Sequence, residues 1–189
     1  DHRIRFNFAT RWRNKKVLGL NYGLNGNVMK SHSTSVFLWD NLNEGLFRPL
    51  PGTLTTTIGT QFYLDPFVNF TGPQGTLHSF RGRWYRQNFD NDNDQSNAND
   101  MLYGEYQVQR KFDLLGETTV TAGVTGQHVL SHSVLYSGGP NADGRNTATD
   151  VAGYLQVDKK LMDRLMLSAG ARYERFKVND YEHGEPVFR

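Results

Sequence analysis

A long stretch of alternating side chains constrains the fold of this chain more than any other feature of its sequence. Between Val17 and Met29, Leu, Tyr or Val fills most even positions, and Gly or Asn fills the odd positions between them. Successive side chains of a β-strand point to opposite faces, so the pattern predicts a strand with one apolar and one polar face. It covers about twelve residues, whereas a soluble core strand usually has about five or six. Crossing a bilayer at a tilt of about 45° takes roughly nine to eleven residues, so this strand is long enough to span.

The same alternation returns along the rest of the chain and predicts eight strands in total. Pro66 weakens one of the less regular candidates, because proline removes a hydrogen-bond donor from the ladder. The regular stretches are residues 4–11, 102–112, 118–127, 151–158 and 167–174, and the less regular ones are 61–70 and 76–89.

The connections between these strands also alternate, between short turns and long polar loops. Short segments with turn-forming residues occur at 14–16, 72–75, 113–116 and 162–164. Long polar stretches lie at about 30–60, 90–100 and 131–147, an asymmetry typical of bacterial outer-membrane barrels. A soluble β-sandwich predicts shorter strands and no such rhythm. We therefore predict an all-β fold of antiparallel, up-and-down transmembrane β-barrel strands.

Aromatic residues near the predicted strand ends agree with this fold. Trp12 and Phe112 each precede a short turn, and Tyr173 and Phe176 lie toward the far end of the last strand. Rings at such positions form girdles at the level of the lipid headgroups.

Composition excludes several classes of function. The 189 residues contain no Cys, which excludes disulfide scaffolds, thiolate zinc sites and Cys nucleophiles. A formal net charge of +2 is too small to indicate a nucleic-acid partner. No run approaches the ~20 apolar residues of a transmembrane helix. We find no nucleophile elbow and no phosphate-binding loop, so we expect no enzymatic activity.

Several strands resemble the barrel of TonB-dependent outer-membrane receptors, in particular the variety found in Bacteroidetes-type bacteria. The resemblance extends over essentially the whole chain, although its motifs describe barrel strands and not a ligand site. It is carried by the segments Leu64–Phe70, His78–Tyr85, Tyr103–Gln107, Ala152–Lys160 and Leu165–Glu174.

The resemblance implies a barrel of about 22 strands around a globular plug, with a short TonB-binding box. Nothing in the sequence resembles the plug or the box, so we expect residues 1–189 to be an internal part of the barrel domain. It would lie in the outer membrane of a Gram-negative bacterium, in contact with lipid. The TonB complex would act through a part outside this sequence. The implied function is uptake of a scarce ligand such as an iron complex, a corrinoid or a glycan.

Two other functions remain open at this point. A free-standing eight-stranded outer-membrane barrel would have a structural or adhesive role, because its narrow interior fills with side chains. Small residues on the polar side, such as Gly23 and Gly123, suit a wider lumen better. A soluble lipocalin-like binder would need an apolar interior. A slice of a larger barrel has two open edges and an apolar face, so we expect it to self-associate in water or to need detergent.

The candidate ligand site is a set of polar residues on two consecutive strands joined by the segment 90–100. Arg and Tyr side chains along a water-filled passage suit an anionic chelate, through charge-assisted hydrogen bonds and ring contacts. The alternative is that barrel interiors are polar in any case and that the Arg residues pair with carboxylates of a plug. The predicted lumen-facing residues are Arg81, Arg83, Tyr85, Gln87, Tyr103 and Glu105.

No cofactor is predicted, and one weak metal alternative is kept. Asp90, Asp92 and Asp94 form a D-x-D-x-D pattern, but Gln95 and Met101 stand where an EF-hand loop needs Gly and Glu. A looser calcium site is the remaining alternative there. His128 and His132 would lie about 13 Å apart on a strand, too far for one metal ion unless the chain bends.

Overall fold

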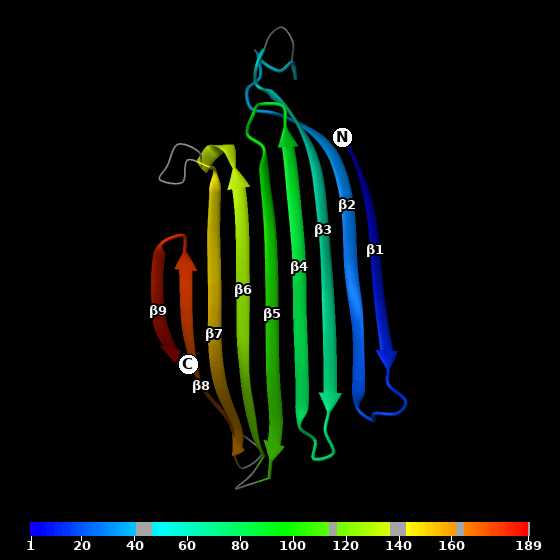
Figure 1. The fold of residues 1–189 in the computed structure, drawn as a ribbon, viewed down its shortest axis with the longest axis vertical. Coiled ribbons are helices and arrows are strands. Elements are labelled where there is room, and N and C mark those ends of the chain that lie inside the picture. The colour runs from blue at the N-terminus through cyan, green and yellow to red at the C-terminus, as the bar shows by residue number, and fades with distance from the viewer. Residues whose placement is uncertain (41–46, 114–116, 137–142, 162–164, 189) are drawn as a thin grey trace.

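The computed structural model describes residues 1–40, 47–113, 117–136, 143–161 and 165–188, which form one sheet of nine antiparallel strands in chain order (Figure 1). The short 3-10 helix η1 spans Val134–Tyr136, and no helix among the described residues is long and apolar enough to cross a membrane. The strands are β1 (His2–Arg13), β2 (Leu20–Val36), β3 (Leu54–Thr71), β4 (Leu77–Asn91), β5 (Asn97–Phe112), β6 (Thr118–Ser133), β7 (Arg145–Leu161), β8 (Leu165–Val178) and β9 (Tyr181–Phe188).

The register of the strands gives the sheet two chemically distinct faces. Residues directly opposite each other in an antiparallel pair point to the same side. Phe80 lies opposite Val68 on β3 and Tyr106 on β5. We call this side the apolar face and the other side the polar face. The apolar face carries Phe6, Phe8, Leu24, Val28, Leu64, Val68, Phe80, Trp84, Leu102, Tyr106, Val124, Val151, Leu155 and Tyr173.

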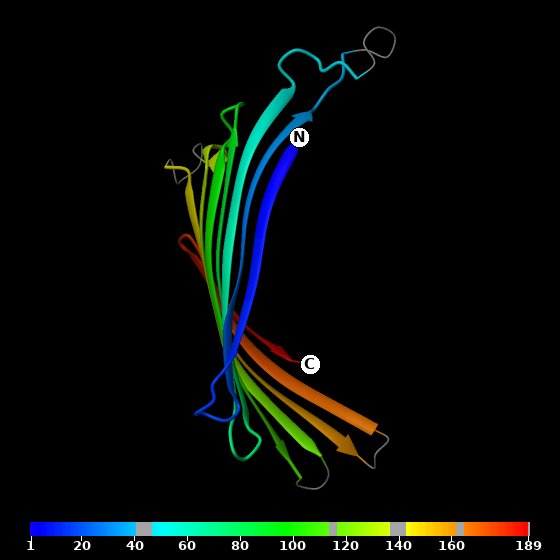
Figure 2. The same cartoon turned by 90° about the vertical axis from the view of Figure 1, so that its right-hand side faces the viewer.

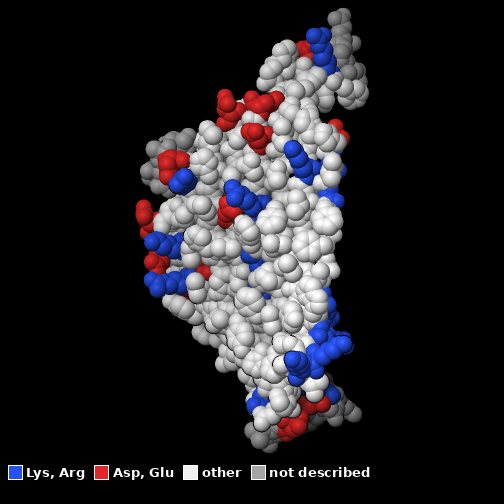
Figure 3. Space-filling model, turned by 45° about the vertical axis from the view of Figure 1, so that its right-hand side comes forward, with Lys and Arg blue, Asp and Glu red and all other residues white. Residues whose placement is uncertain are grey.

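The sheet has almost no hydrophobic core. Among the described residues, Met29 and Ala152 are the only buried apolar side chains. Large residues of the apolar face stay exposed: Phe6 is 65% exposed and Val124 is 56% exposed. Figure 3 shows a broad surface with few charged side chains, whereas charges gather toward the two ends of the sheet and along the left-hand edge of the view. A single layer of this kind needs lipid or another protein layer against its apolar face.

The sheet is bowed and open. Figure 2 shows its two ends bending toward the same side, as in a section of a barrel wall. β1 and β9 are the two edges, and no pairing joins them among the described residues. A free-standing eight-stranded barrel requires its first and last strands to pair, so the described arrangement disagrees with that alternative.

The strands are more numerous and longer than the sequence predicts. β9 is a ninth strand, joined to β8 through Asn179, which has a positive φ of 52°. The connection expected at 90–100 is shorter than the sequence suggests, because β4 runs to Asn91 and β5 begins at Asn97. Likewise β2 runs to Val36 and β3 begins at Leu54, which shortens the expected loop at 30–60. Outside a bilayer both faces of a strand meet water, so the strands continue without apolar alternation.

Parts of the predicted connections lie outside the described residues. These parts are 41–46 and 137–142 in two expected loops, and 114–116 and 162–164 in two expected turns. We call the end of the sheet that carries the connections 37–53 and 134–144 the loop end, and the opposite end the turn end (Figure 1).

Aromatic rings form a row on the apolar face near the turn end. Trp12 stacks on Tyr22 with ring centroids 6.0 Å apart. His78 stacks between Phe70 and Tyr106 at 5.9 Å and 6.2 Å, as expected for an interfacial girdle.

Phe176 does not belong to such a girdle. It lies on the polar face, where its ring contacts Tyr181 and His183 on β9. Its neighbour Tyr173 does lie on the apolar face, with 57% of its surface exposed. A single residue of offset along a strand is enough to move a ring to the opposite face.

Candidate functional site

The backbone ladder between β3 and β4 contains a defect. The pairing of these strands runs without a shift from Leu64 opposite Trp84 to Phe67 opposite Arg81, but it omits the two positions between. Pro66 has no N–H, so it cannot donate to the carbonyl of Gly82, and no side chain of the described residues replaces that donor.

An ion pair joins the two strands beside this defect. The Arg83 Nε donates to Asp65 Oδ1 at 2.7 Å, and its Nη2 donates to Oδ2 at 2.6 Å. The Arg83 guanidinium also lies 5.1 Å from the centroid of the Tyr63 ring. This two-pronged geometry holds β3 and β4 together where a backbone bond is lost. The charge of Arg83 is therefore paired within the sheet, and the contact of Arg83 with a ligand stays a prediction.

Arg81 is the uncompensated cation of the site. It lies opposite Glu105 on β5 and is exposed, and it forms no ion pair or hydrogen bond with another described residue. It lines an open hollow of ≈ 570 Å³ on the polar face. Besides Arg81, the walls of the hollow include Asn25, Asp65, Asn69, Arg83, Tyr103 and Gln127. A cation beside amide groups, a phenol and the paired charges of Asp65 and Arg83 suits an anionic group of a ligand or of another protein segment.

Glu105 is the centre of a hydrogen-bonded group on the neighbouring strands. Its Oε2 accepts from the hydroxyl of Tyr103 at 3.0 Å, and its Oε1 accepts from the hydroxyl of Tyr154 on β7 at 3.0 Å. On β8, the Arg172 Nε donates to Glu174 Oε2 at 2.9 Å. Glu105, Tyr154, Arg172 and Glu174 line a second open hollow of ≈ 790 Å³. The bond between Tyr154 and Glu105 links β7 to β5, and the two bonds to Glu105 orient two phenols on the polar face.

The remaining predicted site residues lie nearer the loop end. Tyr85 donates through its hydroxyl to Gln87 Oε1 two residues further along β4. Both side chains are half-buried and share the polar face with Arg81. The structure therefore places all six predicted residues on the face expected from alternation, but in three bonded groups and one cation, Arg81, without an ion pair among the described residues.

The carboxylates of the calcium alternative are engaged in local hydrogen bonds. Asp90 Oδ1 accepts from the Ser96 hydroxyl at 3.0 Å, and Asp92 Oδ1 accepts from the backbone N–H of Thr56 at 3.0 Å. Asp94 adopts a positive φ of 60° in the turn. In the part of the chain that the structure describes, no group of three or more potential metal ligands converges. The calcium alternative gains no support from this arrangement.

Sequence reasoning missed three residues that build the site. Asp65, Tyr154 and Arg172 come from other strands than the two that were singled out. Alternation places each of them on the polar face, but only the register shows which of them meet. For Asp65, the sequence did contain a signal, since it directly precedes the proline that interrupts the ladder.

These features define a class of protein. The strands form a meander without a hydrophobic core, and they are longer than a bilayer requires. One side of the sheet is apolar and the other is polar. Together these features define a wall segment of a transmembrane β-barrel. The chain belongs to the family of TonB dependent receptor-like β-barrels, whose model matches residues 1–186.

Solved structures confirm the fold. The chain is similar to the ferripyoverdine receptor of the outer membrane of Pseudomonas aeruginosa, with a TM-score of 0.68 and 11% identity over 98% of this chain and 32% of that one. The alcaligin outer-membrane receptor FauA of Bordetella pertussis gives a TM-score of 0.63 and 10% identity over 98% and 31%. The siderophore receptor PirA of P. aeruginosa gives a TM-score of 0.57 and 11% identity over 98% and 35%.

The chain thus spans about a third of the length of these receptors. A search of curated protein sequences gives no match.

Proposed function

We propose that this chain is part of the barrel wall of a TonB-dependent receptor that imports a scarce ligand across the outer membrane of a Gram-negative bacterium. The observation that carries the proposal is the open sheet in a chain of this family. One face of the sheet is continuously apolar, and on the other face polar side chains are hydrogen-bonded to one another. Transport energy would reach the receptor from the TonB complex through a part outside this sequence.

The two faces of such a wall have different roles. Strand pairing satisfies the backbone groups of the chain inside the lipid, and the apolar face meets the acyl chains. The polar face lines the passage and presents Arg81 and the phenols of Tyr103 and Tyr154 to its contents. A segment like this one supplies contacts and an enclosure, with no bond made or broken.

We further propose that the ligand carries negative charge, as an iron chelate does, which favours the iron complex over a neutral glycan. Arg81 supports this choice, because it is the polar-face cation at the hollow that forms no ion pair with a described carboxylate. The solved structures of similar fold include receptors for ferripyoverdine and other siderophores. The subclass found in Bacteroidetes-type bacteria remains a proposal on the sequence resemblance alone.

The test uses the full-length receptor in its source organism. A strain that lacks the gene should lose uptake of at least one member of a panel of ⁵⁵Fe-labelled anionic chelates, and the wild-type gene should restore it. Arg81→Gln should lower that uptake at least tenfold at limiting ligand concentration. Arg110→Gln on the apolar face is the matched control, and it should have no effect. Unchanged uptake of all iron chelates in the deletion strain would overturn the proposed ligand class.

A further inference from the structure

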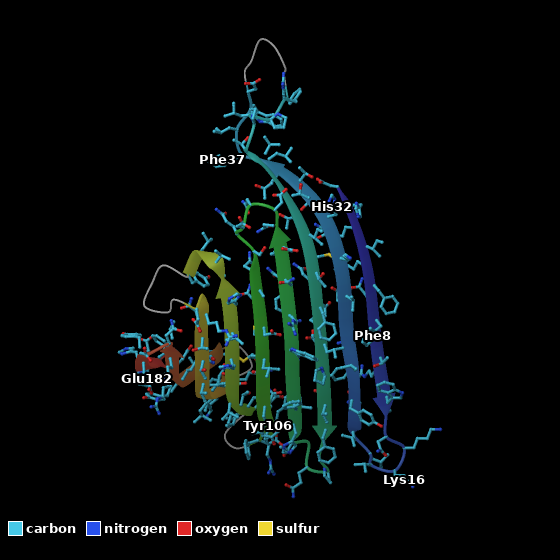
Figure 4. The ribbon with its side chains drawn as sticks, turned by 45° about the horizontal axis from the view of Figure 1, so that its top comes forward. Phe8, Lys16, His32, Phe37, Tyr106 and Glu182 are labelled. Atoms are coloured by element: carbon cyan, nitrogen blue, oxygen red, sulfur yellow. The ribbon has the colours of Figure 1, made fainter. Side chains whose placement is uncertain are left out.

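Two histidines face each other across β1 and β2 toward the loop end. His2 lies directly opposite His32 in the register, so both side chains lie on the side of the apolar face. Their rings are stacked, with centroids 5.1 Å apart and an interplanar angle of 18°. Figure 4 shows His32 on β2 toward the loop end, close to the start of β1. In the described pairing, no other two of the six histidines lie opposite each other.

The ring nitrogens of this pair are open to a ligand. Neither ring forms a hydrogen bond or an ion pair with another described residue. His2 is exposed and His32 is half-buried, so water reaches both side chains. By contrast, Nδ1 of His128 lies 2.8 Å from the hydroxyl of Thr149. His2 and His32 therefore present unused nitrogen ligands side by side.

We infer that His2 and His32 together bind a divalent transition-metal ion. Imidazole suits Zn²⁺, Cu²⁺ and Ni²⁺, and its bond to such an ion is about 2.0–2.1 Å long. Two nitrogens on one ion therefore lie about 3–4 Å apart, whereas the Cβ atoms of directly opposite residues lie about 4.5–5.5 Å apart. The rings can reach this spacing by rotating about their side-chain torsions, with no shift of the strands. Water occupies the remaining coordination positions of the ion.

The backbone holds the two histidines in place before a metal ion binds. Asp1 Oδ1 accepts a hydrogen bond from the backbone N–H of Thr34 at 2.8 Å, which ties the start of β1 to β2 beyond His32. From His2 onward, the pairing with β2 continues along the whole of β1. Two ligands that are already in register lose little conformational freedom on binding, so they chelate an ion better than two independent rings do.

The charges around the pair are compatible with a bound cation. Lys30 precedes His32 by two positions on the same face, and it is exposed and forms no ion pair with another described residue. Residues two apart on a strand are about 7 Å apart, so its ammonium group can turn away from the rings on a long stem. The carboxylate of Asp1 adds one negative charge at the same end of the strand pair. The site lies on the face opposite the hollow that contains Arg81, so this inference goes beyond the proposed function.

The experiment measures Cu²⁺ binding by the full-length receptor, purified in mild detergent without a polyhistidine tag and freed of metal by a chelator. Isothermal titration calorimetry gives the affinity, and electron paramagnetic resonance at one equivalent of Cu²⁺ counts the nitrogens bound to the ion. We expect two nitrogens in wild type. His2→Gln and His32→Gln should each weaken binding more than about tenfold, because even the loss of a group that only supports a metal ligand costs about that much. The double variant should bind no more weakly than either single variant, because one imidazole alone does not chelate.

The matched control is His128→Gln, which removes a histidine from the same face that has no histidine opposite it. This variant should keep the Cu²⁺ affinity of wild type. Equal Cu²⁺ affinity of wild type and of His2→Gln/His32→Gln would overturn the inference. A wild-type spectrum with one bound nitrogen or none would overturn it as well, and that result does not depend on the folding of any variant.

Discussion

The ladder defect at Pro66 predicts that the Asp65–Arg83 pair stabilises the barrel. The pair replaces one backbone hydrogen bond between β3 and β4, which contributes about 1 kcal/mol. Its side chains are 22% and 46% exposed, so water weakens the attraction. We expect a coupling free energy of about 1.5 kcal/mol, between the ~0.5 kcal/mol of an exposed ion pair and the ~3 kcal/mol of a hydrogen bond to a charged group.

The assay is a double-mutant cycle on the full-length receptor reconstituted in lipid vesicles. Asp65→Asn, Arg83→Gln and the double variant are compared with wild type in urea unfolding, with Trp fluorescence as the signal. Each single substitution should lower the free energy of unfolding by more than the loss of the ion pair alone, because the partner charge is left without its counter-ion. A coupling free energy below about 0.3 kcal/mol would refute the reasoning.

A second variant tests the cause of the defect. Pro66→Ala restores a backbone N–H opposite the Gly82 carbonyl. In the background of Asp65→Asn/Arg83→Gln it should therefore raise the free energy of unfolding by about 1 kcal/mol. In wild type the gain should be smaller, because the ion pair already holds the strands in register. An equal gain in both backgrounds would show that the ion pair and the missing bond are independent.

Three further predictions follow from the geometry. Gly23→Ala should lower the yield of folded barrel, because a Cβ there would lie 2.1 Å from the carbonyl oxygen of Thr10, whereas Gly104→Ala, with nothing within 4 Å, should fold as wild type does in a heat-modifiability gel. Tyr154→Phe should cost about 1.5–2 kcal/mol in urea unfolding, because the hydroxyl donates to the Glu105 carboxylate, and an unchanged midpoint would remove Glu105 as the centre of that group. Residues 1–189 expressed alone should form oligomers or need detergent in multi-angle light scattering, and a monodisperse monomer in plain buffer would contradict the wall-segment interpretation.

Alternation in the sequence was sufficient to predict the faces of the sheet. Gly and Asn between larger residues gave the faces of β2 correctly, although residues 17–19 belong to the turn before it and the strand continues to Val36. The same period assigned Arg81 and Glu105 to one side. This works because the side-chain period of a strand is two wherever one face meets lipid. It fails where that contrast ends, which is why residues 90–100 were expected to be a loop.

The contacts of the site were not predictable from one strand at a time. Asp65 meets Arg83, and Tyr154 reaches Glu105, only because of the register between neighbouring strands. Register depends on turn geometry and on the sum of many cross-strand contacts, and it leaves no local signature in the sequence. The proline at 66 was the exception, since its missing N–H marks a defect in any pairing.

The near absence of buried side chains has a consequence for how this protein can change over evolutionary time. In a globular domain, close packing couples the volumes of many core residues, so substitutions must compensate one another. Here only Met29 and Ala152 are buried apolar residues among those described, and most positions need only suit the medium on their side of the sheet. Substitutions that keep an apolar residue on the apolar face and a polar residue on the polar face are then nearly independent of each other. Receptors with 10–11% identity to this chain can therefore retain its fold over 98% of its length.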